Sequence, residues 1–275
     1  MDEQPREERA AVRGERLIPI LALCALAAGC GRTTPSHGAG APTPSAVAAY
    51  LSPPQLTAAV RQAAAASLSG TATPGAAVRL NSPDGSAIAG SADRGGVWKL
   101  SAPVGAAPRL YSLSETLGGR LVRATGYLAV LPSPGPVAAM LHPAAAAAMT
   151  PSDTERGITA IDYDGSGAAV ASGRAAPGEN IRLELDGKEA GEDRADARGL
   201  FSGVLSRPLA AGAHMLRATG EHLQAVVAFD AVRPVRIATP PFTAQRLDGA
   251  WRIDWTPPGG GVQSTVLFDH KGGRP

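Results

Sequence analysis

The sequence predicts an all-β chain in which one strand-and-turn module occurs twice and is followed by a C-terminal β-meander. Residues 70–80 (GTATPGAAVRL) return as residues 173–183 (GRAAPGENIRL), 103 positions later. Turn signals recur roughly every 8–12 residues, which is the spacing typical of an all-β sandwich. The 33 glycines and 24 prolines among 275 residues suit many short strands joined by turns.

The two copies stay in parallel beyond this first stretch. Asp-Gly pairs follow it at positions 84–85 and 186–187, and Asp-Gly between extended segments indicates a hairpin because glycine adopts positive φ at no steric cost. The turn sequences that lead to Trp98 and Phe201 also match (DRGGVW and DARGLF). We therefore expect a second turn in each copy, followed by a strand whose first aromatic side chain points inward.

The copies differ by one insertion. The sequence RATG at positions 123–126 recurs at positions 217–220, an offset of 94 instead of 103. The first copy therefore carries nine extra residues, around positions 112–119. This loop is one of the places where the copies could differ in binding.

The last strand-like segment carries the large aromatic side chains. In residues 250–255 (AWRIDW), Trp251, Ile253 and Trp255 alternate with Arg252 and Asp254, so one face of a strand holds all three apolar side chains. Two interpretations of Trp251 and Trp255 are open. The two rings could face a ligand and stack on the sugar rings of a glycan, or they could form the core of a small meander.

The N-terminus has the pattern of a targeting signal. Residues 17–28 (LIPILALCALAA) are an apolar run of 12 residues after Arg13 and Arg16, too short for the roughly 20 residues of a membrane-spanning helix. The run fits the hydrophobic region of a signal peptide. The first residues (MDEQPREERAAV) are too acidic for such a leader, so translation could start at Val12 instead of Met1.

The end of this leader resembles the lipobox of bacterial lipoproteins, in which small residues precede a cysteine. Residues 26–30 read LAAGC, and Cys24 and Cys30 are the only cysteines of the sequence. The resemblance implies cleavage before Cys30, lipidation (palmitate included) of that residue, and attachment to membrane lipid. Gly31 after the cysteine resembles the signal for outer-membrane delivery, facing the periplasm. The alternative is an ordinary secretory signal in which Cys30 has no role.

These features divide the chain into seven parts. We expect a lipoprotein signal peptide (1–29), a flexible tether (30–47), a short helix or spacer (48–67), an Ig-like domain (68–142), a linker (143–157), a second Ig-like domain (158–232) and a C-terminal β-meander (233–270). The helix is expected over residues 55–66 (QLTAAVRQAAAA), where apolar residues recur at helical spacing after Pro54.

The name Ig-like rests on a resemblance. The second copy (GRAAPG..IRLELDGK..G...AD.RG.F...L...LAAGAH.LRATG) looks like the bacterial Ig-like modules of envelope and surface proteins, some of which also carry peptidoglycan-binding domains. It covers residues 171–229 well and residues 68–130 more loosely. The resemblance implies two tandem Ig-like β-sandwiches; it is poorly specific for function.

The sequence offers little catalytic chemistry. The net charge of +2 is too small for a nucleic-acid partner. The five histidines show no metal-ligand spacing, and residues 162–167 (DYDGSG) match only half of a calcium loop, so a hairpin turn is the better interpretation. We expect no enzyme activity, no cofactor and no metal. The prediction is a membrane-tethered scaffold or binding module of the cell envelope, contacting peptidoglycan or another envelope protein. The alternative is an accessory or spacer subunit of an envelope transport or secretion complex.

Overall fold

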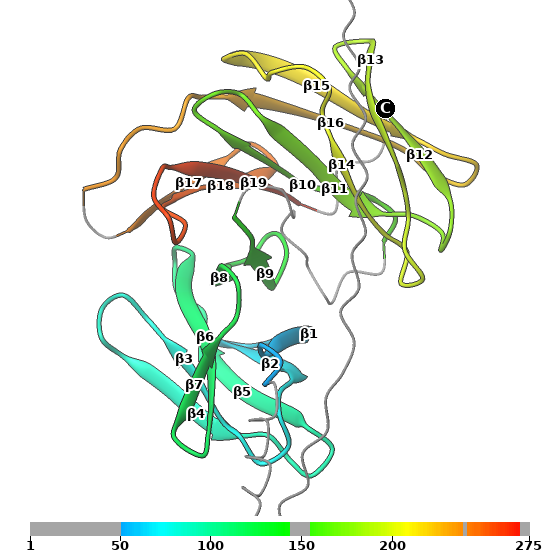
Figure 1. Cartoon of the computed structure of the whole chain (residues 1–275). Helices are drawn as coiled ribbons and strands as arrows, with labels where there is room; N and C mark the ends of the chain where they lie inside the picture. The colour runs from blue at the N-terminus through cyan, green and yellow to red at the C-terminus, as the bar shows by residue number, and fades with distance from the viewer. Residues whose placement is uncertain (1–50, 144–154, 239–240, 270–275) are drawn as a thin grey trace, which may run out of the picture. The chain divides into compact units, whose positions relative to one another are not determined.

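The structure, a computed structural model, describes residues 51–143, 155–238 and 241–269, and every regular element within these ranges is a β-strand (Figure 1). The prediction of an all-β chain is confirmed. The signal peptide, Cys30 and the tether lie outside the described residues, as does most of the expected linker at 143–157.

The first nine strands form module 1. They are β1 (Gln55–Gln62), β2 (Ala65–Thr71), β3 (Ala77–Asn81), β4 (Ala87–Ser91), β5 (Val97–Pro103), β6 (Arg109–Leu117), β7 (Arg120–Arg123), β8 (Tyr127–Val130) and β9 (Ala138–Leu141). One sheet has the order β1-β2-β5 and the other β4-β3-β6-β8-β9, with β7 paired to β6. Between them lies a core that includes Leu68, Val78, Trp98 and Leu113.

The next seven strands form module 2, and three more form the meander. Module 2 contains β10 (Gly157–Asp164), β11 (Ala169–Arg174), β12 (Asn180–Leu185), β13 (Lys188–Arg194), β14 (Leu200–Val204), β15 (Gly212–Thr219) and β16 (Gln224–Ala231); the meander contains β17 (Phe242–Leu247), β18 (Ala250–Trp255) and β19 (Gln263–Phe268). One sheet has the order β13-β12-β15-β16. The other has the order β14-β11-β10-β19-β18-β17, so the meander extends a sheet of module 2.

The repeat in the sequence is a repeat in topology. In module 1, β2 lies between β1 and β5, and β3 lies between β4 and β6; in module 2, β11 lies between β10 and β14, and β12 lies between β13 and β15. The strands that the two modules share are three in one sheet and four in the other, since β8 lies beside β6 as β16 lies beside β15. Three strands packed on four with this antiparallel connectivity are the architecture of an Ig-like β-sandwich. The shared motifs thus mark equivalent strands.

One aromatic ring per module explains the glycine that opens the repeated stretch. Trp98 and Phe201 are buried, as the sequence predicted, with 1% and 2% of their surface exposed. A Cβ atom on Gly70 would lie 2.5 Å from the Trp98 ring, and one on Gly173 would lie 2.5 Å from the Phe201 ring. Each ring therefore packs on bare backbone, which only glycine provides.

The expected insertion is a β-hairpin. β6 continues to Leu117, the chain turns at two glycines, and β7 pairs back on β6 from Ser114 to Leu117. Module 2 lacks this extension, because β15 ends at Thr219 and passes directly towards β16. Leu121 of the hairpin is half exposed.

The helix expected over residues 55–66 is wrong. This segment forms β1, a turn at Ala63 (φ 43°) and the start of β2. Ala59, Ala66 and Leu68 are fully buried in the core of module 1. Alanine favours helices, but intrinsic propensity is weak next to a strand partner and a core that the rest of the module supplies.

The sheet that contains the meander is covered on both faces. Along β19, Val266 and Phe268 face the core of module 2, while Leu267 faces a third apolar cluster. All six residues of β19 are buried. Period-two alternation places successive side chains on opposite faces, so this strand needs apolar partners on both sides.

The third cluster, which we call the apolar joint, contains residues of both modules and the meander. Its buried members are Leu110, Ala129, Leu131, Ala139, Leu141, Ala160, Trp251, Ile253, Trp255 and Leu267. Trp255 makes an edge-to-face contact with Tyr127 of β8, with ring centroids 5.8 Å apart. Burial of this apolar surface favours contact between the two modules.

Candidate functional site

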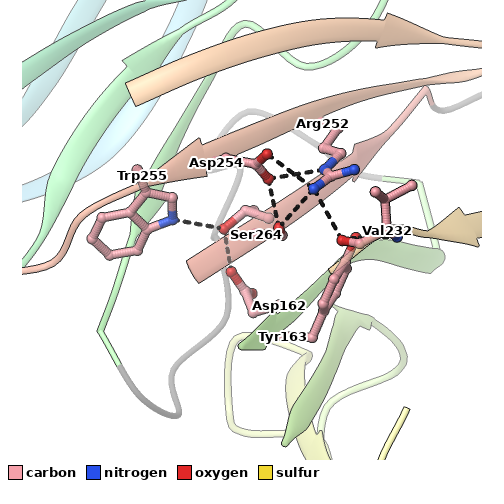
Figure 2. A network of polar contacts seen from close by, with 8 residues as sticks. Asp162, Tyr163, Val232, Arg252, Asp254, Trp255 and Ser264 are labelled. Carbon is pink, nitrogen blue, oxygen red and sulfur yellow. Dashed lines mark hydrogen bonds and ion pairs between the residues drawn. The ribbon is translucent and has the colours of Figure 1, made fainter. Parts of the chain in front are cut away.

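A buried polar network lies in the sheet of β10, β19 and β18 (Figure 2). Arg252 and Asp254 both belong to β18, two residues apart, so their side chains share one face of the strand. The guanidinium donates from Nε to Asp254 Oδ1 and from Nη2 to Asp254 Oδ2, each at 2.9 Å. Ser264 Oγ of β19 donates to Asp254 Oδ1 at 2.5 Å. This is a bidentate ion pair with a hydroxyl as third partner.

The network binds the chain that leaves module 2. Arg252 Nη2 donates to the carbonyl of Val232 at 3.0 Å, just after β16. The hydroxyl of Tyr163 lies 3.3 Å from both the carbonyl oxygen and the amide nitrogen of Val232. Burial raises the pKa of Tyr163, and the charge of Arg252 opposes that rise only in part. Tyr163 is thus a neutral hydrogen-bonding group at ordinary pH.

A second set of polar contacts lies on the face of β18 and β19 that carries the apolar joint. Trp255 Nε1 donates to Thr265 Oγ1 at 3.1 Å, and Thr265 Oγ1 donates in turn to Asp162 Oδ1. Trp255 and Thr265 are fully buried, and Asp162 is 4% exposed. These buried polar groups therefore satisfy one another by hydrogen bonds inside the protein.

Trp251 and Trp255, the two residues considered as ligand-facing, are both part of the apolar joint. Their exposed fractions are 8% and 0%. The Arg246 guanidinium lies 5.5 Å from the Trp251 ring centroid and is itself paired with Asp269. Neither ring has a face open for stacking on a sugar, so the structure assigns both to the core.

A carboxylate accepts from the equivalent backbone amide of the repeat in both modules, but it comes from a strand in module 1 and from the turn itself in module 2. In module 1, Glu115 of β6 accepts from the amide of Thr73 at 2.9 Å. In module 2, Glu179 accepts from the amide of Ala176 at 2.9 Å. Burial opposes the charge of Glu179, yet hydrogen bonds from the amides of His222 and Ala176 lower its pKa below the ordinary value. Both carboxylates stabilise the Pro-Gly turn of the repeat.

The half-calcium loop at residues 162–167 is a turn. Asp164 Oδ1 accepts from the amide and the hydroxyl of Ser166 at 2.8 and 2.6 Å. His214 is also placed in the fold: its Nδ1 lies 2.8 Å from Asp186 Oδ2 and its Nε2 lies 3.0 Å from the carbonyl oxygen of Ala210. Within the described ranges, no three His, Cys, Asp or Glu side chains are grouped closely enough to hold a metal ion.

An open groove on module 2 has a volume of about 770 Å³. Charged and polar residues of β12, of β13, of the end of β15 and of the loop after it line the groove: Asn180, Arg182, Glu192, Asp193, Arg194, Thr219 and Glu221. Arg182 and Glu192 are directly opposite on neighbouring strands. The groove therefore presents both signs of charge and hydrogen-bonding groups to solvent.

The buried network and the groove were not predicted from the sequence. A signal for the network existed, because Arg252 and Asp254 interrupt the only strand with two tryptophans. The groove left no such signal, since its residues come from three strands. In the part of the chain that the structure describes, no helix is long and apolar enough to cross a bilayer.

No protein-family model and no curated protein sequence matches the chain. Several solved structures, among them the following three, are similar to it at low sequence identity. The chain is 14% identical to the BSP domain of a biofilm-associated protein, over 70% of this chain and 30% of that one (TM-score 0.25). It is 15% identical to the central fibronectin-III array of RIM-binding protein, over 76% and 74% of the two chains (TM-score 0.26). It is 14% identical to a structure titled for host cell surface retention of a 1.5-MDa bacterial ice-binding adhesin, over 74% and 80% (TM-score 0.22). Likeness at this level does not indicate what the chain binds.

Proposed function

We propose that the chain is a non-catalytic lipoprotein of the bacterial cell envelope that acts as a membrane-tethered scaffold or binding module. The observation that carries the proposal is the pairing of a lipobox-like sequence ending at Cys30 with two tandem β-modules. The charged side chains near the tryptophans support a non-catalytic role. Arg252, Asp254 and Asp162 each bind other groups of the fold.

The anchor follows from simple energetics. Each buried CH₂ of an acyl chain contributes about 0.8 kcal/mol to membrane binding, and stable attachment takes two chains or more. Lipidation of Cys30 would supply them, and the polar residues of 30–47 would leave the modules free of the membrane surface. We propose the outer membrane, with the modules in the periplasm, as the location.

Lipidation can be tested directly. The wild-type chain and a Cys30→Ser variant are expressed in a Gram-negative host with labelled palmitate. We expect label and membrane association for the wild type, and neither for Cys30→Ser, while Cys24→Ser behaves as the wild type. Wild-type protein that keeps residues 1–11 in its mature form, detected by mass spectrometry, contradicts both the anchor and the start at Val12.

The groove on module 2 is the surface that best fits a partner of the envelope. Peptidoglycan carries hydroxyl, amide, amine and carboxylate groups, and the groove offers Arg182, Glu192 and Thr219 to such groups. Arg182 is exposed and lies on the central part of the groove, between Glu192 and Thr219 on the flanking strands. Arginine is a common binding determinant at protein surfaces.

Binding is measured with purified sacculi and the Cys30→Ser chain. Arg182→Ala should weaken binding about 5- to 10-fold, the effect of losing about 1 to 1.4 kcal/mol. Arg207→Ala changes another exposed arginine, which lies outside the groove, and should bind as before. If both variants bind equally well, the groove is not the binding site. If neither the Cys30→Ser parent nor its variants bind, peptidoglycan is not the partner.

A second function, a spacer subunit of an envelope complex, is favoured by the apolar joint. Ten buried residues contributed by both modules and the meander form one cluster, which suits a chain that holds two attachment points apart. Extraction in mild detergent as a stable large complex would support this function. Extraction as a free protein would favour the binding module.

A further inference from the structure

The two modules differ in how one equivalent strand edge is paired. In module 2, β10 pairs with β11 on one side and with β19 on the other, from Ala160 opposite Leu267 to Asp164 opposite Gln263. In module 1, the equivalent strand β1 pairs with β2, and no other described strand lies beside it. The edge that the meander fills in module 2 is therefore unpaired in module 1 among the described residues.

The register shows that the two edges correspond residue by residue. β1 has a bulge between Leu56 and Ala58, and β10 has one between Ile158 and Ala160. After the bulge Ala58 lies opposite Ser69, as Ala160 lies opposite Ser172. Residues 58–62 thus match residues 160–164, which are the residues that bind β19.

The residues of β1 are more exposed than the equivalent residues of β10, as expected for an unpaired strand edge. Asp162 is 4% exposed beneath the apolar joint, whereas its equivalent Val60 is 56% exposed. Six consecutive residues of β10 are buried, while in β1 only Ala59 is. An exposed β-branched residue on an unpaired edge is a site for strand addition.

The features of β1 that could block pairing do not do so at the equivalent edge of β10, whose bulge lies before the residues that pair with β19. The strand QLTAAVRQ contains no proline and no lysine, the residues that commonly block edges. Its one charged side chain, Arg61, points to the loop after β8 and donates to the carbonyls of Leu131 and Pro136 at 2.9 and 3.3 Å. Tyr163 makes the equivalent contact in module 2 while β19 is paired beside it, so this contact leaves the edge open.

We propose that β1 pairs with β1 of a second copy of this chain, antiparallel and about a two-fold axis, with Val60 opposite Val60. Residues directly opposite in an antiparallel pair point to the same face of the sheet, so Val60 can face only residue 58, 60 or 62 of the other copy. With Val60 on the axis, Arg61 lies opposite Ala59, and the two guanidinium groups are kept apart. In this arrangement the β1 edge of each copy is paired with the β1 edge of the other. A symmetric contact, in which both copies use the same surface, leaves neither edge unpaired.

A ladder of five residues is a small interface. Interfaces below about 1,200 Å² belong to weak and transient complexes, so we expect a dissociation constant of roughly 10–100 µM, equivalent to about −6.8 to −5.5 kcal/mol. Such a dimer forms at the concentrations used for structural work and on a crowded membrane surface. This inference does not depend on the proposed anchor.

The first experiment is sedimentation equilibrium from about 5 to 500 µM, a range that brackets the expected constant. The full chain carries Cys24→Ser and Cys30→Ser, so that neither lipid nor disulfides drive association. We expect a monomer–dimer equilibrium, lost in Val60→Lys and kept in Val235→Lys, which changes a valine that is 71% exposed after β16. Thermal unfolding followed by circular dichroism establishes that Val60→Lys is folded. A monomer throughout the range, or a dimer that survives Val60→Lys in folded protein, overturns the proposal.

The second experiment tests by cross-linking whether Val60 lies opposite Val60 of the other copy, and it does not depend on a variant that disrupts the dimer. Val60→Cys in the cysteine-free background should form a disulfide-linked dimer on mild oxidation, because opposite Cβ atoms on paired strands approach to about 4.5–5.5 Å. Val235→Cys should cross-link at least about ten times more slowly, since no paired strand holds it near its copy. Equal rates for both variants contradict the pairing. A monomer whose β1 amides resist hydrogen exchange also contradicts it, since a segment of the same chain would then cover the edge.

Discussion

Arg61 and Tyr163 occupy equivalent positions in the two modules, and each binds the backbone that follows an equivalent strand, β8 in module 1 and β16 in module 2. Arg61 donates to the carbonyl of Leu131 at 2.9 Å, and Tyr163 lies 3.3 Å from the carbonyl oxygen of Val232. Leu131 follows β8 and Val232 follows β16. The contact is thus present in both modules, but a guanidinium makes it in module 1 and a phenol hydroxyl makes it in module 2.

This contact predicts a modest and comparable loss in both modules. Tyr163→Phe removes only the hydroxyl and should lower the free energy of unfolding by about 1 kcal/mol, because a typical hydrogen bond contributes about 0.5–1.5 kcal/mol. Arg61→Met should cost somewhat more, since it leaves three carbonyl oxygens with one partner fewer. Urea unfolding measures both. A variant as stable as the wild type would show that the contact is incidental.

The ion pair of Arg252 and Asp254 should be sensitive to loss of one partner and tolerant of loss of both. Their side chains are 7% and 14% exposed. Arg252→Met leaves an uncompensated carboxylate and should cost about 3–5 kcal/mol, whereas Arg252→Met with Asp254→Leu should cost much less. Denaturant unfolding of the two single variants and the double variant gives the coupling energy. Additive losses would contradict the assignment of the pair as one unit.

The glycines that open the repeated stretch should not accept a side chain. A Cβ atom on Gly70 would lie 1.8 Å from the carbonyl oxygen of Gln55, and one on Gly173 would lie 2.1 Å from that of Gly157. We expect Gly70→Ala and Gly173→Ala to cost about 1–3 kcal/mol or more through overpacking. Gly165→Ala is the matched control, because a Cβ atom on Gly165 would meet no other atom within 4 Å. Thermal or urea unfolding compares the three variants.

Acid should destabilise module 2 partly through Glu179. The pKa of Glu179 in the folded state lies below its ordinary value of 4.5. The unfolded state therefore binds protons first, and the stabilising contribution, complete above the ordinary pKa, is lost as the pH falls through the folded-state pKa. Glu179→Gln should lower stability at about pH 7 and flatten the decline between roughly pH 6 and pH 3. Glu189→Gln, at an exposed position, should leave that decline unchanged.

Trp255 should behave as a core residue. It is fully buried, packs against Tyr127 and donates to Thr265. Trp255→Ala should cost about 3–5 kcal/mol, the range for a large aromatic side chain removed from a core. Trp255→Phe keeps most of the packing and should cost less. Folded Trp255→Ala protein that is as stable as the wild type but has lost binding to glycans would contradict this role.

The sequence was most informative where a turn demands a particular residue. Asp93 and Asp196, at matching places in the repeat, each accept from the amides two and four residues later. Gly96 and Gly199 then both adopt φ +78°. Such local requirements can be recognised in a single sequence, because the partners lie within a few residues of each other.

Contacts between distant residues could not be predicted in this way. Glu115 reaches the turn of the repeat from β6, far along the chain, whereas in module 2 Glu179 lies within the turn itself, so no shared motif marks Glu115. The strand β1 was predicted as part of a helix because its apolar residues recur at helical spacing after Pro54. What decides its conformation is β2 and the core of module 1, and these lie outside any local window.

By itself the sequence determined the strands and turns that its local patterns mark from residue 70 onward: the two copies, the glycines at positive φ, the inward aromatics and the alternation in residues 250–255. These follow from steric limits on φ and from the period of a strand, which act over a few residues. Only the tertiary structure decided that Trp251 and Trp255 are core, that the meander completes the edge of β10, and that no described strand pairs with the same edge of β1. Those outcomes depend on which surfaces meet, because burial is a property of the assembled sheets.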